Sequence, residues 1–222
     1  MRTKSQIMRS FFLGLVLMFG VTTGARASIV LGQVDDFEDG TIMSWFGGAT
    51  QVNVADGGPL GLGDNYMSVT SNGLNGPGSR LATYNEVQWS GDYTAAGVTG
   101  ITVDLKNFGT EDLSMRLFLL NGDGGNFTTN VAVSLPADGQ WHTLYFGMTA
   151  ADLITVDGGW DLDLTLSNLP RLMIRHQPGE PAGIGAPPPI ATTVGFDNIT
   201  AVPEPGTLAL LAIGLATLRR RR

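Results

Sequence analysis

The sequence predicts an all-β protein, built as a two-sheet antiparallel β-sandwich between two terminal processing segments. Apolar and polar residues alternate with a period of two in several short runs, as they do in strands with one buried face. Clusters of Gly, Asn, Asp and Pro separate these runs and indicate turns. No central segment has a convincing helical stripe. About nine or ten strands at this spacing are typical of a sandwich.

Five of these runs are regular enough to predict individual strands. They span 101–106, 115–119, 131–135, 141–145 and 172–176. In the fourth run we expect Trp141 to face the core and His142 to face solvent or the outer side of the sheet, because adjacent residues alternate. In the central region helix is expected only as one short turn within 150–156, and a short hydrophobic helix is expected in the C-terminal segment described below.

One long connection stands out between the last two predicted strands. Residues 177–190 contain five prolines and three glycines and show no regular apolar pattern. This composition predicts an extended, semi-rigid excursion. We expect an unselective surface loop in preference to a binding loop.

Residues 1–27 are predicted to be a secretory signal peptide. The first ten residues carry Arg2, Lys4 and Arg9 but no acid, and 11–21 are apolar. The segment Ala25-Arg26-Ala27 then matches an A-x-A cleavage site, in which Ala25 and Ala27 are the small residues. The mature chain is therefore expected to begin near Ser28 and to be exported by the general secretion machinery. The alternative is an uncleaved N-terminal anchor.

Residues 202–222 form a second processing segment with three parts in fixed order. Pro203, Glu204 and Pro205 come first, and an apolar and small-residue run follows over 206–218. Four arginines then end the chain, namely Arg219, Arg220, Arg221 and Arg222. Prolines separate the run from the folded domain, and arginines resist crossing a membrane. The order predicts a domain outside, a short span and a basic anchor inside, although a run this short also suits a core helix.

This tail resembles the PEP-CTERM sorting signal of Gram-negative bacteria. The resemblance implies transient anchoring in the inner membrane and processing by an exosortase at the Pro-Glu-Pro motif. It further implies delivery to the cell surface or to the extracellular matrix. The resemblance predicts where the protein is delivered, but not what it binds or whether it is an enzyme.

The charge of the central region differs strongly from that of the whole chain. The formal charge of the chain is −7, but eight of the 13 basic residues lie in the two terminal segments. Between Ser28 and Val202 there are 19 acidic and five basic residues, which gives a net charge of −14. Such a balance disfavours nucleic acid and anionic lipid, and it suits divalent cations and neutral partners.

Composition also limits how the domain is stabilised. Residues 28–201 are long enough for one domain with its own core. The chain has no cysteine, so an exported fold has no disulfide to support it. Stability must come from the core, aided by a bound ion. The absence of thiols also excludes thiol catalysis, thiolate zinc sites and iron–sulfur clusters.

Three short motifs give the central region a second resemblance. An acidic opening segment, 34–40, and a closing segment, 194–199, flank a strand that reads GQWHTLYF over 139–146. These motifs resemble jelly-roll sandwiches of the galactose-binding-like type, which include many carbohydrate-binding modules. The resemblance implies that the first and last strands lie side by side and share a structural calcium. Concanavalin-like sandwiches are the alternative.

Calcium is the cofactor that this arrangement suggests. It binds six to eight oxygens, mostly from carboxylates and carbonyls. Asp36, Glu38 and Asp197 could supply carboxylates if the end strands meet, whereas Asp35 alternates to the other face. The alternative is an acidic edge strand whose charges prevent aggregation.

Glycan binding requires exposed aromatic rings beside polar groups. Trp45, Trp89, Tyr93 and Trp160 lie next to Gly, Ser or Asp near predicted strand ends. They are therefore our candidate glycan-binding residues, although tryptophan in a sandwich often belongs to the core.

No catalytic residue is predicted. Asp161 and Asp163 have strand spacing, with Asp157 nearby, but the E-x-D-x-E strand common in sandwich hydrolases is absent. Nucleophile-elbow, zincin and P-loop motifs are absent too. The sequence therefore favours an exported, non-enzymatic surface or matrix protein that is adhesive, structural or glycan-binding, with extracellular polysaccharide as its partner and no role in nucleic-acid binding. A polysaccharide-active enzyme of sandwich fold is the alternative.

Overall fold

The computed structural model describes residues 28–121, 123–157, 160–179 and 187–204. The predicted signal peptide with Ala25 and Ala27 lies outside this part. So do Pro205, the predicted C-terminal hydrophobic helix and the arginines that end the chain. In the described part, no helix is long and apolar enough to cross a membrane.

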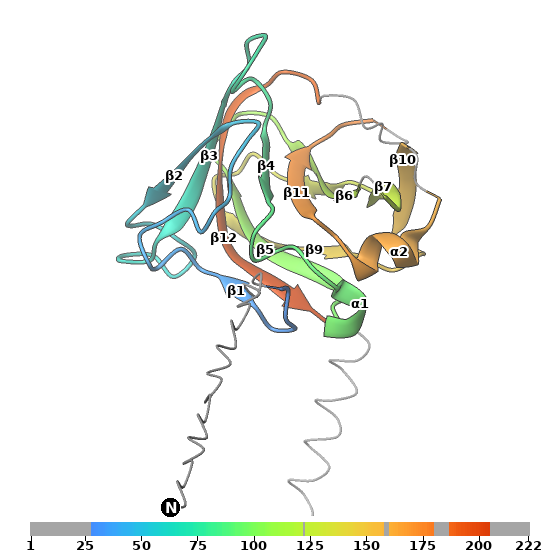
Figure 1. The fold of residues 1–222 in the computed structure, drawn as a ribbon. Coiled ribbons are helices and arrows are strands. Elements are labelled where there is room, and N and C mark those ends of the chain that lie inside the picture. The colour runs from blue at the N-terminus through green and yellow to red at the C-terminus, as the bar shows by residue number, and fades with distance from the viewer. Residues whose placement is uncertain (1–27, 122, 158–159, 180–186, 205–222) are drawn as a thin grey trace, which may run out of the picture.

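The domain is a sandwich of two antiparallel sheets, which confirms the predicted fold class (Figure 1). Sheet A contains, in spatial order, β2 (Thr50–Val54), β3 (Tyr66–Asn72), β12 (Ala191–Val202), β5 (Gly100–Asn107) and β9 (Trp141–Gly147), with β1 (Val34–Asp35) beside β12. Sheet B contains, in spatial order, β10 (Leu153–Asp157), β7 (Gly125–Thr129), β6 (Leu113–Asn121), β11 (Arg171–His176) and β4 (Ala82–Asn85), with β8 (Val133–Leu135) beside β6.

The core lies between the two sheets, where the predicted alternation places apolar side chains. Ile101, Val103 and Leu105 of β5 are completely buried, as are Leu172 and Ile174 of β11. Their polar neighbours in sequence point to the outer faces because successive side chains in a strand alternate. The period of two thus correctly predicted β5 and β11 with their inner faces, whereas Val131, the first residue of the third predicted run, is 70% exposed and precedes β8.

In β9 the predicted inner face is wrong. Leu144 and Phe146 are buried in the core, whereas Trp141 is half-buried on the outer face of sheet A. The Trp141 ring lies over Gly195, where an added Cβ would come within 2.7 Å of it. The missing side chain at Gly195 therefore accommodates an indole that the sequence pattern assigned to the core.

Two short helices lie where the sequence analysis expected a strand end, at Tyr93, and strand spacing, at Asp161 and Asp163. α1 (Tyr93–Ala96) begins at Asp92 and ends at Gly97, which has a left-handed φ of 71°. α2 (Leu162–Ser167) begins at Asp161, whose carboxylate accepts a hydrogen bond from the Leu164 N–H at 2.8 Å. Each cap satisfies a free backbone donor at the helix start. The helical turn expected within 150–156 is instead largely β10.

The two ends of the domain are joined through sheet A. In β1, Val34 and Asp35 pair with Thr200 and Ile199 of β12. This confirms that the first and last strands lie side by side. The pairing also brings the acidic opening segment next to the closing strand, where the predicted calcium ligands lie.

Candidate functional site

Sheet B presents an outer face rich in arginine and aromatic side chains. We define the arginine face as the outward side chains of β4, β6, β7 and β11 together with Phe46, which bridges to Tyr84 at the edge of the sheet. The face is composed of Phe46, Ala82, Tyr84, Ser114, Arg116, Phe118, Leu120, Asn126, Thr128, Arg171, Met173 and Arg175. Their sequence neighbours, such as Leu117 and Ile174, point into the core.

One half of the arginine face is accessible and carries a compact aromatic cluster. The rings of Phe46 and Tyr84 lie 4.3 Å apart, and the Arg171 guanidinium lies 4.4 Å from the centre of the Tyr84 ring. Phe46 is 40% exposed. Arg171 also donates a hydrogen bond to Glu86 through Nε, and this pair is partly exposed. The cluster thus offers flat apolar surface directly beside a fixed cation.

The other half of the face is covered by backbone. Arg116 is fully buried and donates to four carbonyl oxygens, those of Thr129, Asn130, Gln177 and Gly179. Two of these carbonyls belong to the start of the Pro-rich connection. Arg116 therefore holds the described start of that connection, 177–179, against the sheet.

Arg175 lies beside Arg116 on the same half. Its guanidinium lies 3.7 Å from the centre of the Phe118 ring, which is also fully buried. Burial lowers the pKa of Arg175 to about 10, so the side chain is still a cation at neutral pH.

Trp160 is the one predicted glycan-binding aromatic that the structure leaves accessible. Trp160 is 70% exposed, and its backbone N–H donates a hydrogen bond to the carbonyl of Gly124 in the β6–β7 turn at 3.4 Å. That turn follows Leu120 and precedes Asn126, which pair with each other at one edge of the arginine face. Trp160 is thus close to the turn that joins β6 and β7.

The other three predicted glycan-binding aromatics are not exposed to solvent. Trp45, Trp89 and Tyr93 are completely buried in the core. Their polar atoms are satisfied internally, because both indoles donate to Asp35 and the Tyr93 hydroxyl donates to the Trp89 carbonyl at 2.8 Å. With these partners the rings need no contact with water.

Asp35 is the acceptor at the centre of this buried network. Its Oδ2 accepts hydrogen bonds from Trp45 Nε1 at 2.7 Å, Trp89 Nε1 at 2.6 Å and Gln88 Nε2 at 2.9 Å. Burial nevertheless raises the pKa of Asp35, and the hydrogen bonds oppose that rise. The network borders a pocket of about 660 Å³ between β1 and the loop after it.

Asp197 is a second buried carboxylate, with very different surroundings. It is 1% exposed and lies directly opposite Asp104 across the β5–β12 ladder. Its Oδ1 accepts a hydrogen bond from the adjacent Asn198 N–H at 2.7 Å. Burial raises the pKa of Asp197 to about 7, and the carboxylates of Asp64, Asp104 and Asp36 contribute to the rise.

The predicted calcium ligands are neighbours but do not form a finished metal site. Asp36 is exposed and close enough to Asp197 to raise its pKa, while Glu38 Oε1 accepts a hydrogen bond from the Asn65 N–H at 2.8 Å. Across the described ranges, no group of three or more His, Cys, Asp or Glu side chains is placed to hold a metal ion. As placed, the predicted set therefore does not fit calcium without side-chain movement.

The strand-like acid pair considered for catalysis is not on a strand. Asp161 is the N-cap of α2, and Asp163 lies in its first turn, where carboxylates favour the helix. Their roles are thus structural in this arrangement.

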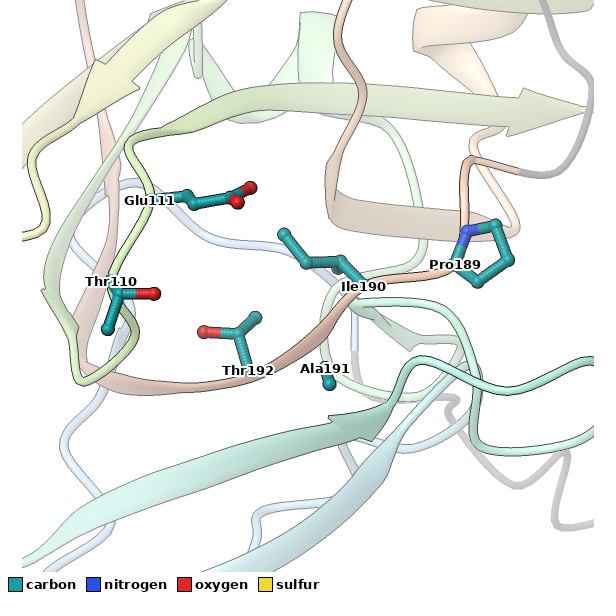
Figure 2. A pocket seen from close by; sticks show the side chains of 6 residues that line it. All are labelled: Thr110, Glu111, Pro189, Ile190, Ala191 and Thr192. Atoms are coloured by element: carbon teal, nitrogen blue, oxygen red, sulfur yellow. The ribbon is translucent and has the colours of Figure 1, made fainter.

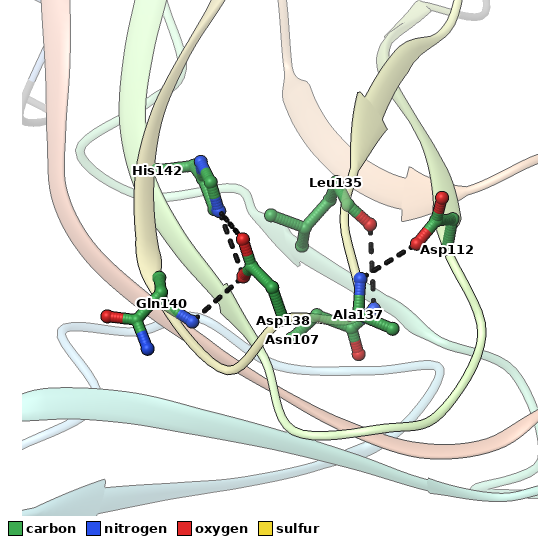
Figure 3. A network of polar contacts seen from close by, with 7 residues as sticks. All are labelled: Asn107, Asp112, Leu135, Ala137, Asp138, Gln140 and His142. Carbon is green, nitrogen blue, oxygen red and sulfur yellow. Dashed lines mark hydrogen bonds and ion pairs between the residues drawn. The ribbon is translucent and has the colours of Figure 1, made fainter.

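A second polar network surrounds His142 (Figure 3). His142 Nε2 lies 3.0 Å from Asp138 Oδ1, which also accepts from the Gln140 N–H at 2.9 Å. These contacts lower the pKa of Asp138, with the Gln140 hydrogen bond as the main cause. None of the seven residues drawn carries a hydroxyl or thiol nucleophile. The network organises the turn between β8 and β9.

A pocket of about 310 Å³ lies between the β5–β6 loop and the segment leading into β12. Figure 2 shows Glu111 and Ile190 pointing toward one another across it. Its lining residues, Thr110, Glu111 and Pro189–Thr192, include neither a cation nor an aromatic ring. The arginine face is therefore better equipped for a sugar ligand than this pocket.

Comparison with known proteins supports the prediction for the tail. A family model described as the PEP-CTERM protein-sorting motif matches residues 201–222. The chain ends in a PEP-CTERM sorting motif. The motif implies export and membrane anchoring before processing. Pro203 and Glu204 follow directly after β12 in the structure. No curated protein matches the chain.

Solved structures share the fold of the domain. The family 11 carbohydrate-binding module from Clostridium thermocellum, solved with a β-1,3-1,4-mixed-linked tetrasaccharide, is 19% identical, with a TM-score of 0.50 over 78% of this chain and 97% of that one. An exo-β-agarase is 16% identical, with a TM-score of 0.56 over 78% of this chain. The chain spans only 25% of the length of that agarase. At these identities the likeness shows the fold alone.

The sequence reasoning missed the residues of the accessible cluster. Phe46, Tyr84 and Arg171 are far apart in the sequence, and only the pairing of β4 with β11 and the bridge to Phe46 bring them together. One signal was present, since Met173 and Arg175 occupy alternate positions in the predicted strand 172–176, and Arg171 precedes that strand with the same spacing. Such spacing places both arginines on one face.

Proposed function

We propose that this protein is an exported, non-enzymatic carbohydrate-binding sandwich that binds extracellular polysaccharide on the arginine face. The observation that supports the proposal is the partly exposed cluster of Phe46, Tyr84 and Arg171, and the exposed Trp160 beside the β6–β7 turn is a second candidate contact. Aromatic rings offer the apolar surface that sugar rings can contact, and polar neighbours fix orientation. The shared fold with a carbohydrate-binding module agrees with this assignment.

A glycan array with the mature exported protein tests the proposal. Binding should be lost in Tyr84→Ala and weakened in Trp160→Ala. The matched control is Phe108→Ala, because Phe108 is 45% exposed and stacks on Tyr66, which projects from the outer face of sheet A. Binding that Phe108→Ala abolishes and Tyr84→Ala spares would place the site on the other sheet. Release of reducing sugar from any bound polysaccharide would establish the enzymatic alternative.

We also infer that the sorting motif is processed by an exosortase at Pro203-Glu204-Pro205, with delivery to the cell surface or matrix. The family match to residues 201–222 supports this inference. Intact-mass measurement of protein released from the cell surface tests it. The expected mass ends near Glu204. A released form that retains residues 208–222 contradicts cleavage at the motif.

Calcium binding at the junction of the chain ends is a separate proposal. Asp197 and Asp104 oppose each other at close range, with Asp36 and Asp64 contributing further negative charge. A divalent cation would replace this repulsion with shared coordination, once the flanking side chains move. The proposal makes the ion structural and assigns it no part in glycan binding.

A further inference from the structure

The basic residues of the domain are concentrated on one sheet face. Between Ser28 and Val202 the chain has 19 acidic and five basic residues. Three of the five bases, Arg116, Arg171 and Arg175, project from the arginine face. The four strands that form it, β4, β6, β7 and β11, contain neither Asp nor Glu. A strongly acidic domain therefore has one sheet face whose strands carry only positive charge.

Each of these cations is held in place. Arg171 stacks on Tyr84 and pairs with Glu86, Arg175 stacks on Phe118, and Arg116 is bound by backbone carbonyls. Fixed cations cost less ordering entropy on binding than mobile ones. Arg116 and Arg175 are covered and act through their field, which is strengthened by the low-dielectric surroundings. Arg171 is half-exposed and can contact a ligand directly.

We propose that the preferred ligand of the arginine face is an acidic polysaccharide with carboxylates on its sugar rings. This inference rests on the proposed function and names its substrate class. The Phe46–Tyr84 pair would contact the face of a sugar ring, while Arg171 would bind the adjacent carboxylate through paired N–H groups. One accessible guanidinium beside one aromatic pair would bind one carboxylated sugar ring at a time. The net charge of −14 disfavours duplex nucleic acid most, because it carries one phosphate per about 1.7 Å of helix axis.

Glu86 acts as an internal competitor for the ligand. It occupies the Arg171 guanidinium in the free protein, with both side chains 37% exposed. Such exposed ion pairs contribute little, so a ligand carboxylate can take the place of Glu86. Removing the charge of Glu86 should therefore strengthen binding of acidic glycans and leave neutral glycans unaffected.

The test compares two acidic probes, polygalacturonate and alginate, with two neutral ones, mixed-linkage β-glucan and agarose, at low and high ionic strength. We expect the mature protein to prefer the acidic probes, and added salt to weaken that binding. Arg171→Gln should lower affinity for polygalacturonate about tenfold, as expected for loss of a charged hydrogen bond. Glu86→Gln should raise it severalfold. Lys106→Gln is the matched control, because it removes the same charge from sheet A, and melting curves check folding.

The outcomes separate this inference from the proposed function. If neutral glycans bind equally well and depend on Tyr84 but not on Arg171 or salt, the glycan site stands and the acidic preference is wrong. If Lys106→Gln weakens acidic binding as much as Arg171→Gln does, the arginine face is not the site of that preference. Equal binding of single-stranded DNA would show a general polyanion surface and overturn the assignment. If no probe binds, both proposals fail.

Discussion

Asp35 and Asp197 are two buried carboxylates at the joined ends of the chain, and their surroundings are opposite. Each is 1% exposed, and each belongs to one of the paired strands β1 and β12. Asp35 accepts hydrogen bonds from two indoles and an amide. Asp197 lies opposite Asp104 across the ladder and accepts a hydrogen bond from the backbone N–H of Asn198.

The difference shows that burial alone does not decide what a carboxylate does. Burial raises the pKa of both groups. Side-chain donors oppose the rise at Asp35, whereas neighbouring carboxylates reinforce it at Asp197. A buried charge with donors organises a core, while one among like charges favours a proton or a cation. Three experiments test this contrast, from the largest expected effect to the smallest.

Asp35→Ala should destabilise the domain most. It leaves two buried indole donors, from Trp45 and Trp89, and the partly buried amide of Gln88 without their acceptor. Loss of one partner of a buried charged network costs about 3–5 kcal/mol. Urea unfolding of the mature protein measures it. Asp36→Ala is the control, since Asp36 is exposed, and should change the free energy of unfolding by less than about 0.5 kcal/mol. Equal effects of the two substitutions would show that the hydrogen bonds to Asp35 do not contribute to stability as expected.

Asp197→Asn should stabilise the domain at pH 8 when divalent cations are chelated. The pKa of Asp197 in the folded protein is about 7, above the ordinary value of 3.8, so the protonated form is the one that suits the fold. The associated stability is therefore complete below about pH 4 and is lost as the pH rises through about 7. At about 1.4 kcal/mol per pKa unit, this rise in pKa from 3.8 to about 7 means that ionisation costs on the order of 4 kcal/mol.

Unfolding curves between pH 5 and about 8 in chelator check the sign of this effect. The wild type should lose stability with rising pH, and Asp197→Asn should remove most of that slope. Asp104→Asn should reduce it, since it removes one of the charges that raise the pKa of Asp197. A wild type that gains stability over this range would contradict the unfavourable charge at Asp197.

Calcium should stabilise the wild type and not Asp197→Asn. An ion that binds only the folded state contributes about 2.7 kcal/mol at a hundredfold excess over Kd. For a domain of this size, each kcal/mol raises Tm by about 2–4 °C. Melting curves with calcium and with chelator measure the shift. Superimposable wild-type curves would reject the calcium site. Protonation of Asp197 would then be the only means of relieving the repulsion between the carboxylates.

The sequence predicted the sandwich because burial on one face imposes a period of two on every strand. The runs around Ile101, Met115 and Leu172 proved to be strands with the expected inner faces. The prediction failed at Trp141 because an aromatic residue can lie over a glycine of the neighbouring strand, and no local pattern reveals that glycine. It also missed α2, where Asp161 caps a helix that has no clear apolar stripe.

Candidate sites were harder to predict, because the sequence does not show which hydrogen-bond partners the fold will bring to a given side chain. Trp45 and Trp89 look like exposed platforms beside small polar residues, yet Asp35 satisfies their N–H groups inside the core. The sequence did predict that the acidic opening segment would meet Asp197. It could not predict Asp104 as the opposing charge, since that contact depends on the register between β5 and β12.

The sequence by itself determined the sorting motif, the charge balance and the fold class. Each depends on composition or on a pattern within a few neighbouring residues, and such patterns can be recognised without knowing the fold. Only the tertiary structure decided that Phe46, Tyr84 and Arg171 form one cluster, and that Asp35 and Asp197 have opposite surroundings. These arrangements depend on strand order and register between distant segments. A shift of one residue in the pairing would turn every one of these side chains to the other face of its sheet.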